Sequence, residues 1–174
     1  LHTVKVADIP YGKFRDKGVP IDNISNFSSD KEHIIAVTSQ TSLNLYRVIF
    51  VTKLSMMKIV DGGEFDVSKR MVASTKLQEG DEIVDVSVLK EQKDIILQTK
   101  DGYFLKFPLE EIPEKKKGAV GVRGMKLTGT DHVENVYYTR PGMADPVIEF
   151  KEKQFDLSRI KTGRRDSKGT KPRV

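Results

Sequence analysis

The chain has 174 residues, of which 37% are hydrophobic and 32% are charged, so it can form one ordinary domain or a short array of repeats. It contains no cysteine, which excludes disulfide bonds and thiolate metal sites. No stretch approaches the ~20 consecutive apolar residues of a membrane span, and residues 1–10 lack the apolar segment of a secretory signal. Because the chain does not start with methionine, we expect a piece of a longer protein.

The net charge of +5 is distributed unevenly along the chain. Residues 161–174 contain six lysines and arginines and one aspartate, and the rest of the chain is close to neutral. A neutral body with local basic segments favours a polyanion as the partner. The alternative is an ordinary solvated surface that binds no such partner.

The first predicted element is a short strand at residues 3–6 that contains Lys5. A basic loop follows at residues 13–18, and then a second strand at residues 33–37, directly after the acid Glu32. Short segments rich in valine and isoleucine that alternate apolar and polar residues are typical of β-strands. We call these two kinds of strand the lysine strand and the acid-led strand.

The same elements return at steps of about fifty residues, now with an apolar strand, the leading strand, ahead of the lysine strand. The second copy has its leading strand, lysine strand, basic loop and acid-led strand at residues 48–52, 56–59, 68–70 and 82–86. The third copy has them at residues 95–99, 104–107, 115–126 and 132–136. The fourth has the first three at residues 147–150, 154–157 and 161–169, with aspartate in place of the lysine. In the third copy, Asp101-Gly102 between two apolar runs predicts a hairpin turn.

Helix signals are weak, and only residues 109–112, between two prolines, are expected to form a helical turn. One unit of this kind cannot bury its own core, so neighbouring units must stack. We therefore predict an all-β fold, a propeller-like repeat of about three and a half blades of roughly 50 residues that forms a partial or open disc. The predicted units lie near residues 1–45, 46–92, 93–145 and 146–160 onward, followed by a basic C-terminal tail at residues 161–174. The first unit lacks its leading strand.

A basic loop in every unit is the pattern expected of an edge that follows a phosphate backbone. The predicted phosphate contacts are Lys13, Arg15, Lys17, Lys69, Arg70, Lys115, Lys116, Lys117, Arg123, Lys126, Arg164, Arg165 and Lys168. Glycines in these loops allow the main chain to approach another group closely, and they are Gly18, Gly118 and Gly169.

The lysines at the centres of the lysine strands, Lys5, Lys58 and Lys106, allow two interpretations. They can face the outer wall and touch DNA, or they can form the polar side of alternating strands. The sequence favours neither.

Other chemistry is not indicated. Residues 118–124 are rich in glycine, but they match neither the dinucleotide fingerprint nor the Walker pattern, and no predicted helix follows them. The histidines are His2, His33 and His132, and the last two occupy equivalent positions in different units, so they are not expected to converge on a metal or to act as a base. We predict no catalytic residue, no metal site and no cofactor in this chain.

Residues 101–113, followed by residues 117–127, resemble the blade motif of the C-terminal domain of bacterial type IIA topoisomerase A subunits, those of gyrase and topoisomerase IV. Residues 9–21 look like another copy of the motif. The resemblance implies a β-pinwheel, a propeller-like disc that binds, bends and wraps duplex DNA on its basic rim without sequence preference. It also implies an accessory domain and not an enzyme, because the strand-cutting tyrosine and the ATPase, which uses ATP and Mg, lie outside this part of the protein.

The implied partners are duplex DNA, the ATPase subunit and the rest of the topoisomerase A subunit. The implied location is the cytoplasm, at the nucleoid. Neither a membrane nor a small-molecule substrate is expected. Gyrase carries a glutamine-led box rich in arginine and glycine in its first blade, and residues 114–121 are only a relative of it. This difference and the basic tail favour an A subunit like that of topoisomerase IV. The A subunit of gyrase remains the alternative. The alternative function is a propeller-type protein-interaction module without DNA binding.

Overall fold

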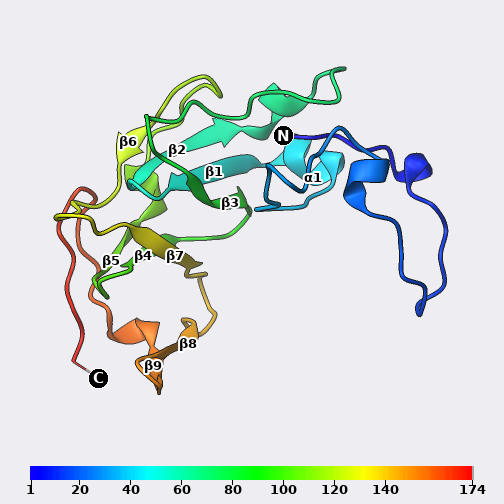
Figure 1. Ribbon diagram of the computed structural model, residues 1–174. Helices are drawn as coiled ribbons and strands as arrows, with labels where there is room; N and C mark the ends of the chain where they lie inside the picture. The colour runs from blue at the N-terminus through cyan, green and yellow to red at the C-terminus, as the bar shows by residue number, and fades with distance from the viewer. Residues whose placement is uncertain (174) are drawn as a thin grey trace.

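The strands form an open arc of antiparallel sheets in the computed structural model, which describes residues 1–173 (Figure 1). They are β1 (Arg47–Thr52), β2 (Met56–Asp61), β3 (Ile83–Leu89), β4 (Asp94–Thr99), β5 (Phe104–Pro108), β6 (Val122–Arg123), β7 (Val133–Tyr138), β8 (Val147–Phe150) and β9 (Lys153–Asp156). The helices of the described residues are α1 (Gln40–Leu45) and the 3₁₀ helices η1 (Val6–Asp8), η2 (Ile21–Asn23), η3 (Gly62–Phe65), η4 (Leu109–Glu111) and η5 (Leu157–Arg159). The predicted all-β, propeller-like open disc is confirmed. No helix within residues 1–173 has the length and hydrophobicity of a membrane span.

Two of the sheets repeat one strand order. Blade 1 consists of β3, β1 and β2, and blade 2 consists of β7, β4 and β5, with the leading strand in the middle of each. A hairpin of β8 and β9 forms blade 3. In blades 1 and 2 the acid-led strand lies toward the inside of the arc and the lysine strand toward the outside (Figure 1). The strands predicted in residues 48–59, 82–86, 95–107 and 132–136 are therefore present, and the structure adds their order within each sheet.

The outer edges of blades 1 and 2 are each covered by a segment that comes from the next unit in the sequence. β6 follows blade 2's lysine strand in the chain but pairs with β2 of blade 1. In the same way, bridges join Phe104 and Lys106 of β5 to Thr170 and Thr162. The described part of the predicted tail thus lies along blade 2. This exchange of segments explains how short sheets are held in one array.

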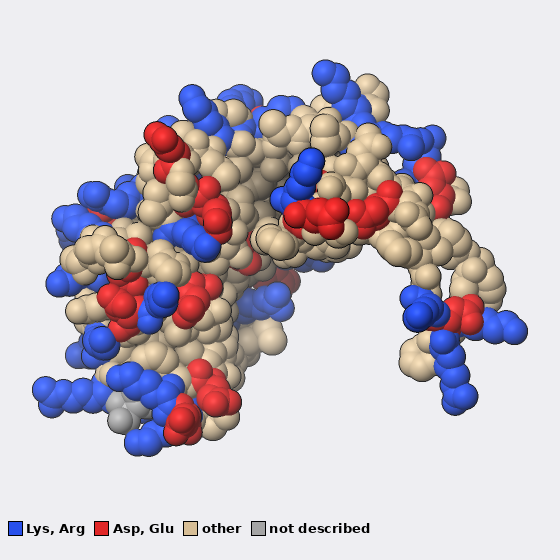
Figure 2. Space-filling model, viewed as in Figure 1, with Lys and Arg blue, Asp and Glu red and all other residues tan. Residues whose placement is uncertain are grey.

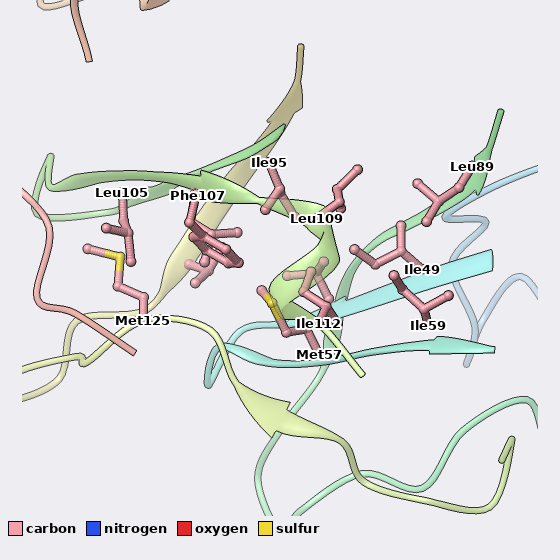
Figure 3. Close-up of a cluster of buried hydrophobic side chains, with 13 residues drawn as sticks. Ile49, Met57, Ile59, Leu89, Ile95, Leu105, Phe107, Leu109, Ile112 and Met125 are labelled. Atoms are coloured by element: carbon pink, nitrogen blue, oxygen red, sulfur yellow. The ribbon is translucent and has the colours of Figure 1, made fainter. Parts of the chain in front are cut away.

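The blades are joined by cores that share their strands. Ile49 and Val51 of β1 face blade 2, where they pack in the cluster of apolar side chains that Figure 3 shows. Val48 and Phe50, on the other face of the same strand, pack against Leu43 of α1 and its neighbours. β1 is therefore buried on both faces, which explains its nearly continuous apolar sequence.

In blades 1 and 2 the acid that precedes the acid-led strand caps a turn of the same blade. Asp81 accepts a hydrogen bond from the N–H of Leu54 at 2.9 Å, and Asp131 accepts one from the N–H of Asp101 at 3.0 Å. Both turns join the leading strand to the lysine strand. The predicted hairpin turn is confirmed, with Gly102 in the left-handed region at φ 82°.

Two predicted strands are wrong. Residues 3–6 and 33–37 form no ladder within residues 1–173; His2 makes one bridge to Met71, and the residues after Lys5 turn into η1. In blades 1 and 2 the leading strand lies between the lysine strand and the acid-led strand. The described residues provide no leading strand for the first unit. Residues 3–6 and 33–37 therefore have no central strand to pair with. The helical turn expected at residues 109–112 is present as η4.

Candidate nucleic-acid interface

Lysines and arginines gather along the outer edge of the blades, where the exchanged segments lie (Figure 2). Two of these segments, residues 115–126 and 161–171, carry most of the predicted phosphate contacts. We call them the first and second rim segments. The first covers β2 of blade 1, and the second covers β5 of blade 2.

Lys58 of β2 anchors the first rim segment by hydrogen bonds to its main chain. Its side chain is fully buried, and its Nζ donates hydrogen bonds to the carbonyl oxygens of Lys116 at 3.2 Å, Lys117 at 2.6 Å and Ala119 at 2.6 Å. Burial lowers the pKa of the Lys58 ammonium, and the nearby Glu64 carboxylate raises it in part. Lys58 therefore does not face solvent; it fixes the exposed loop that lies over it.

The other central lysines differ from it. Lys106 of β5 is also buried, but its Nζ pairs with the Asp145 carboxylate at 2.8 Å. Lys5 is exposed. Of the two interpretations that the sequence left open, contact with DNA is excluded by burial for Lys58 and Lys106.

Glu64 of η3 binds the first rim segment from the side. One carboxylate oxygen accepts a hydrogen bond from the N–H of Lys117 at 3.0 Å, and the other pairs with Lys116 Nζ at 3.2 Å. The hydrogen bond from the Lys117 N–H is the main reason why the pKa of Glu64 is lowered. Lys117 Nζ donates to the Glu64 carbonyl at 3.0 Å, whereas the Lys116 side chain is 88% exposed.

The two rim segments are joined to each other. The N–H of Lys126 donates to the Ser167 carbonyl at 2.8 Å, and the N–H of Asp166 donates to the Gly124 carbonyl at 2.7 Å. Arg165 adds two hydrogen bonds, from Nε to the Glu111 carbonyl at 3.0 Å and from Nη1 to the Arg123 carbonyl at 2.7 Å. Basic residues that are about forty positions apart in the sequence thus form one surface.

Arg123 and Asp166 form an ion pair across the junction. The guanidinium donates to both oxygens of the carboxylate. The pair lowers the pKa of Asp166 and raises that of Arg123. Both side chains are substantially exposed, so the pair is expected to contribute little to stability and to exchange readily with other ions.

Three cations of the second rim segment extend the surface. Arg164 and Lys168 are exposed, as predicted residues of the interface should be. Lys168 and Lys171 both lie over the ring of Tyr103, at 5.7 Å and 5.4 Å from its centre. Lys171 was not among the predicted contacts, but it lies over the same ring as Lys168.

The remaining predicted residues do not join this surface. Lys13, Arg15 and Lys17 are exposed on a loop that projects from the N-terminal end of the arc (Figure 1). Lys69 and Arg70 lie beside the first residues of the chain, where the Arg70 guanidinium is 3.8 Å from Asp8. The structure therefore divides the predicted contacts into one joined surface and two separate groups.

The glycines of the basic loops differ in their surroundings. A Cβ on Gly169 would lie 2.6 Å from the Phe104 carbonyl oxygen, so this glycine does allow a close approach, but to the protein's own main chain. Gly121 is equivalent to it, with φ 105° and the Met57 carbonyl oxygen 2.4 Å from a Cβ. Around Gly18 and Gly118, in contrast, the space is open.

The sequence of the chain matches one known family and several proteins in which that family occurs. The family described as "DNA gyrase C-terminal domain, beta-propeller" matches residues 46–90 and 93–140, just over half of the chain. The DNA gyrase A subunit of Helicobacter pylori is 30% identical over 135 residues, 76% of this chain, and that of Lawsonia intracellularis is 26% identical over 170 residues, 93% of it. The chain spans only 16% and 21% of the length of these two relatives.

Solved structures show the same architecture. The C-terminal domain of DNA topoisomerase IV superimposes with a TM-score of 0.82 at 24% identity, covering 95% of this chain and 53% of that one. The DNA gyrase A C-terminal domain gives a TM-score of 0.70 at 19% identity, covering 90% and 53%. At these identities the likeness shows the fold alone.

Proposed function

Because the chain belongs to the DNA gyrase C-terminal domain family of β-propellers, as part of a topoisomerase A subunit, we propose that it binds duplex DNA along its outer edge and bends it. The observation that carries this proposal is the surface made by the two rim segments, which are joined by main-chain hydrogen bonds and by Arg165. Most of its cations are exposed, with Lys117 and Arg165 half-buried, whereas the lysines that lie under the segments are buried.

The proposed mechanism is electrostatic. Lysines and arginines neutralise phosphates and release counterions, so binding is independent of sequence and depends steeply on salt. Bending a segment of 20–30 base pairs costs on the order of 1–6 kcal/mol, which several phosphate contacts offset. A bent segment is then held near the catalytic part of the topoisomerase.

The proposal also places the chemistry outside this chain. The tyrosine that cuts the strand, the ATPase and its Mg would belong to other parts of the enzyme, with the ATPase on a partner subunit. The chain alone is expected to leave the topology of a supercoiled plasmid unchanged in a relaxation assay. Relaxation by the purified chain would contradict this part of the proposal.

The experiment is the affinity for a short duplex measured against salt concentration, with a charge-matched pair of variants. Replacing Lys115, Lys116 and Arg164 by glutamine should weaken binding to all sequences alike and lower the magnitude of the salt slope by about 2 to 3. Lys117 is left in place because its ammonium donates to the Glu64 carbonyl. The control replaces three exposed lysines outside the rim segments, Lys31, Lys90 and Lys93, and should bind as the unaltered chain does.

Binding that is absent at low salt, or flat across salt, would overturn the proposal. If binding is absent, the propeller-type protein-interaction module is the remaining function. A loss confined to one DNA sequence would instead indicate that bases are read directly.

A further inference from the structure

Each later unit places a segment against the unit before it, and the first unit carries a segment of the same kind. In the third and fourth units this segment starts at the isoleucine that ends a 3₁₀ helix, Ile112 after η4 and Ile160 after η5. Ile9 ends η1 in the same way, and the three isoleucines share one backbone conformation, with φ from −96° to −80° and ψ from 113° to 119°. We call residues 9–20 the first-unit edge segment.

The first-unit edge segment is folded like its equivalents, counted from the isoleucine. The N–H of Asp16 donates to the Lys13 carbonyl at 2.9 Å, and the equivalent turn of the third unit is closed from Ala119 to Lys116 at 3.0 Å. Two residues after each of these positions the segment has a glycine in the left-handed region. These glycines are Gly18 at φ 73°, Gly121 at φ 105° and Gly169 at φ 78°.

The surroundings of the three glycines differ. A Cβ on Gly121 would lie 2.4 Å from the Met57 carbonyl oxygen, and one on Gly169 would lie 2.6 Å from that of Phe104. Both glycines therefore lie against the strand of the preceding unit, where a side chain has no space. A Cβ on Gly18 would meet no atom of residues 1–173 within 4 Å. The first-unit edge segment thus has the conformation of a covering segment but no strand to cover within the described chain.

Two main-chain donors of the segment support this comparison. Gly12 is equivalent to Gly163, whose N–H donates to the Lys106 carbonyl at 2.7 Å. Val19 is equivalent to Thr170, whose N–H donates at 2.8 Å to the carbonyl two residues earlier in the same strand. Hydrogen bonds within residues 1–173 provide no acceptor for the N–H of Gly12 or Val19. A fitting partner therefore offers two carbonyls, two residues apart, on the free edge of one strand.

The apolar side chains of the segment are exposed where their equivalents are buried. Ile112 and Ile160 are 4% and 5% exposed, whereas Ile9 is 51% exposed. Tyr11 and Phe14 are fully exposed on the part of the segment that projects from the arc (Figure 1). Apolar side chains that gather on an exposed surface mark an interaction site.

Blade 3 of a second copy does not fit the segment, although its outer strand β9 pairs only with β8 within residues 1–173. Asp156, which caps η5, is equivalent to Asp61, which caps η3. Four residues before Asp61 lies Met57, the strand residue that an edge glycine contacts. Four residues before Asp156 lies Glu152, which belongs to the hairpin turn and has φ 62°. The strand of blade 3 is therefore too short to pair with Val19.

We propose that the first-unit edge segment closes the outer edge of a further blade, which precedes the first unit in the same topoisomerase A subunit. Gly12 and Val19 donate to two carbonyls of that blade's outer strand, and Gly18 lies against its main chain. The solved domains extend beyond this chain, which matches 53% of the length of each. The proposal goes beyond the proposed function, because it concerns a contact with protein and is independent of DNA.

The test compares amide hydrogen exchange in the 174-residue chain and in the complete A subunit. The amides of Gly12 and Val19 should exchange almost without protection in the chain alone and about a hundredfold or more slowly in the subunit. The equivalent amides of Gly163 and Thr170 are the reference and should be protected in both proteins. This comparison needs no variant. Equal exchange of Gly12 and Val19 in the two proteins would overturn the proposal.

Gly18→Ala tests the close approach, with Gly129→Ala as the matched control. Both glycines have a positive φ, 73° and 61°, and an added Cβ meets no described atom within 4 Å at either position. In the chain alone, both variants should have the same small effect on the melting temperature. In the complete subunit, only Gly18→Ala should make Val19 exchange as fast as in the chain alone. Unchanged protection of Val19 in the Gly18→Ala subunit would contradict the predicted contact.

The state of association of the chain identifies the source of the partner strand. The 174-residue chain should sediment as a monomer, because blade 3 of a second copy does not fit the segment. A dimer that Gly18→Ala dissociates would place the partner strand on a second copy and would overturn the assignment to a preceding blade.

Discussion

Single residues show both what the repeat reveals and what it hides. The recurrence of Glu32, Asp81 and Asp131 is visible in the sequence, but their partners are not. Asp81 and Asp131 cap turns that lie 27 and 30 residues earlier in the chain. Pairing over such distances depends on how the strands are arranged, so it could not be predicted from the spacing of the acids. The contacts of Lys58 and Glu64 with the first rim segment could not be predicted for the same reason.

Gly62 is the residue whose replacement is expected to affect stability most clearly. A Cβ there would lie 1.7 Å from the Leu43 carbonyl oxygen and 2.3 Å from that of Tyr46. Because both obstacles are main chain, Gly62→Ala should lower the free energy of unfolding by about 3 kcal/mol, measured by urea titration. Gly118→Ala, where the space is open, should change it by less than about 0.5 kcal/mol. Equal stabilities of the two variants would contradict the packing around Gly62.

At the scale of elements, the sequence was informative about strands whose partners lie within the chain. Alternating apolar residues predicted β1 to β5 and β7 to β9 at nearly the observed positions. The same pattern failed at residues 33–37, because a strand also needs a neighbour. β6 and α1 were missed, since a two-residue strand has no period and α1 spans fewer than two turns.

The second rim segment provides a test that separates a structural arginine from an interface arginine. Arg165 bonds to the carbonyls of Glu111 and Arg123, so Arg165→Gln should lower the free energy of unfolding by about 1–3 kcal/mol. The neighbouring Arg164 is exposed, so Arg164→Gln should leave stability unchanged and lower the magnitude of the salt slope of duplex binding by about 1. Urea unfolding and binding titrations measure both. The reverse assignment of effects would contradict the geometry of the junction.

For the whole molecule, the contact between blades 1 and 2 includes a hydrogen-bonded carboxylate. Asp85 of β3 accepts hydrogen bonds from the Tyr138 hydroxyl of β7 and from Ser87. Burial raises the pKa of Asp85, although both hydrogen bonds lower it in part, and burial also raises the pKa of Tyr138 well above its usual value. The charged form of Asp85 is therefore less favourable in the folded chain than in the unfolded one.

This shift has a definite sign. Since the folded pKa of Asp85 lies above the unfolded one, its cost is fully present above the folded pKa and disappears as the pH falls through it toward the unfolded value. Asp85→Asn should therefore be more stable than the unaltered chain at neutral pH, and this difference should shrink as the pH is lowered toward about 4. Urea unfolding of both proteins across pH measures the difference. A difference that grows in acid would show that the carboxylate is stabilised in the fold.

Because each edge segment comes from the following repeat, the boundaries of the folded blades do not coincide with those of the sequence repeats. Blade 1 is finished only by residues 122–123, which belong to the following repeat. During synthesis, β2 of blade 1 can pair with β6 only after the following repeat has left the ribosome. A chimaera made by swapping one repeat between two relatives would join each blade to a foreign edge. Recombination that keeps a blade together with its own edge segment would have to cut within the repeats, after each edge segment.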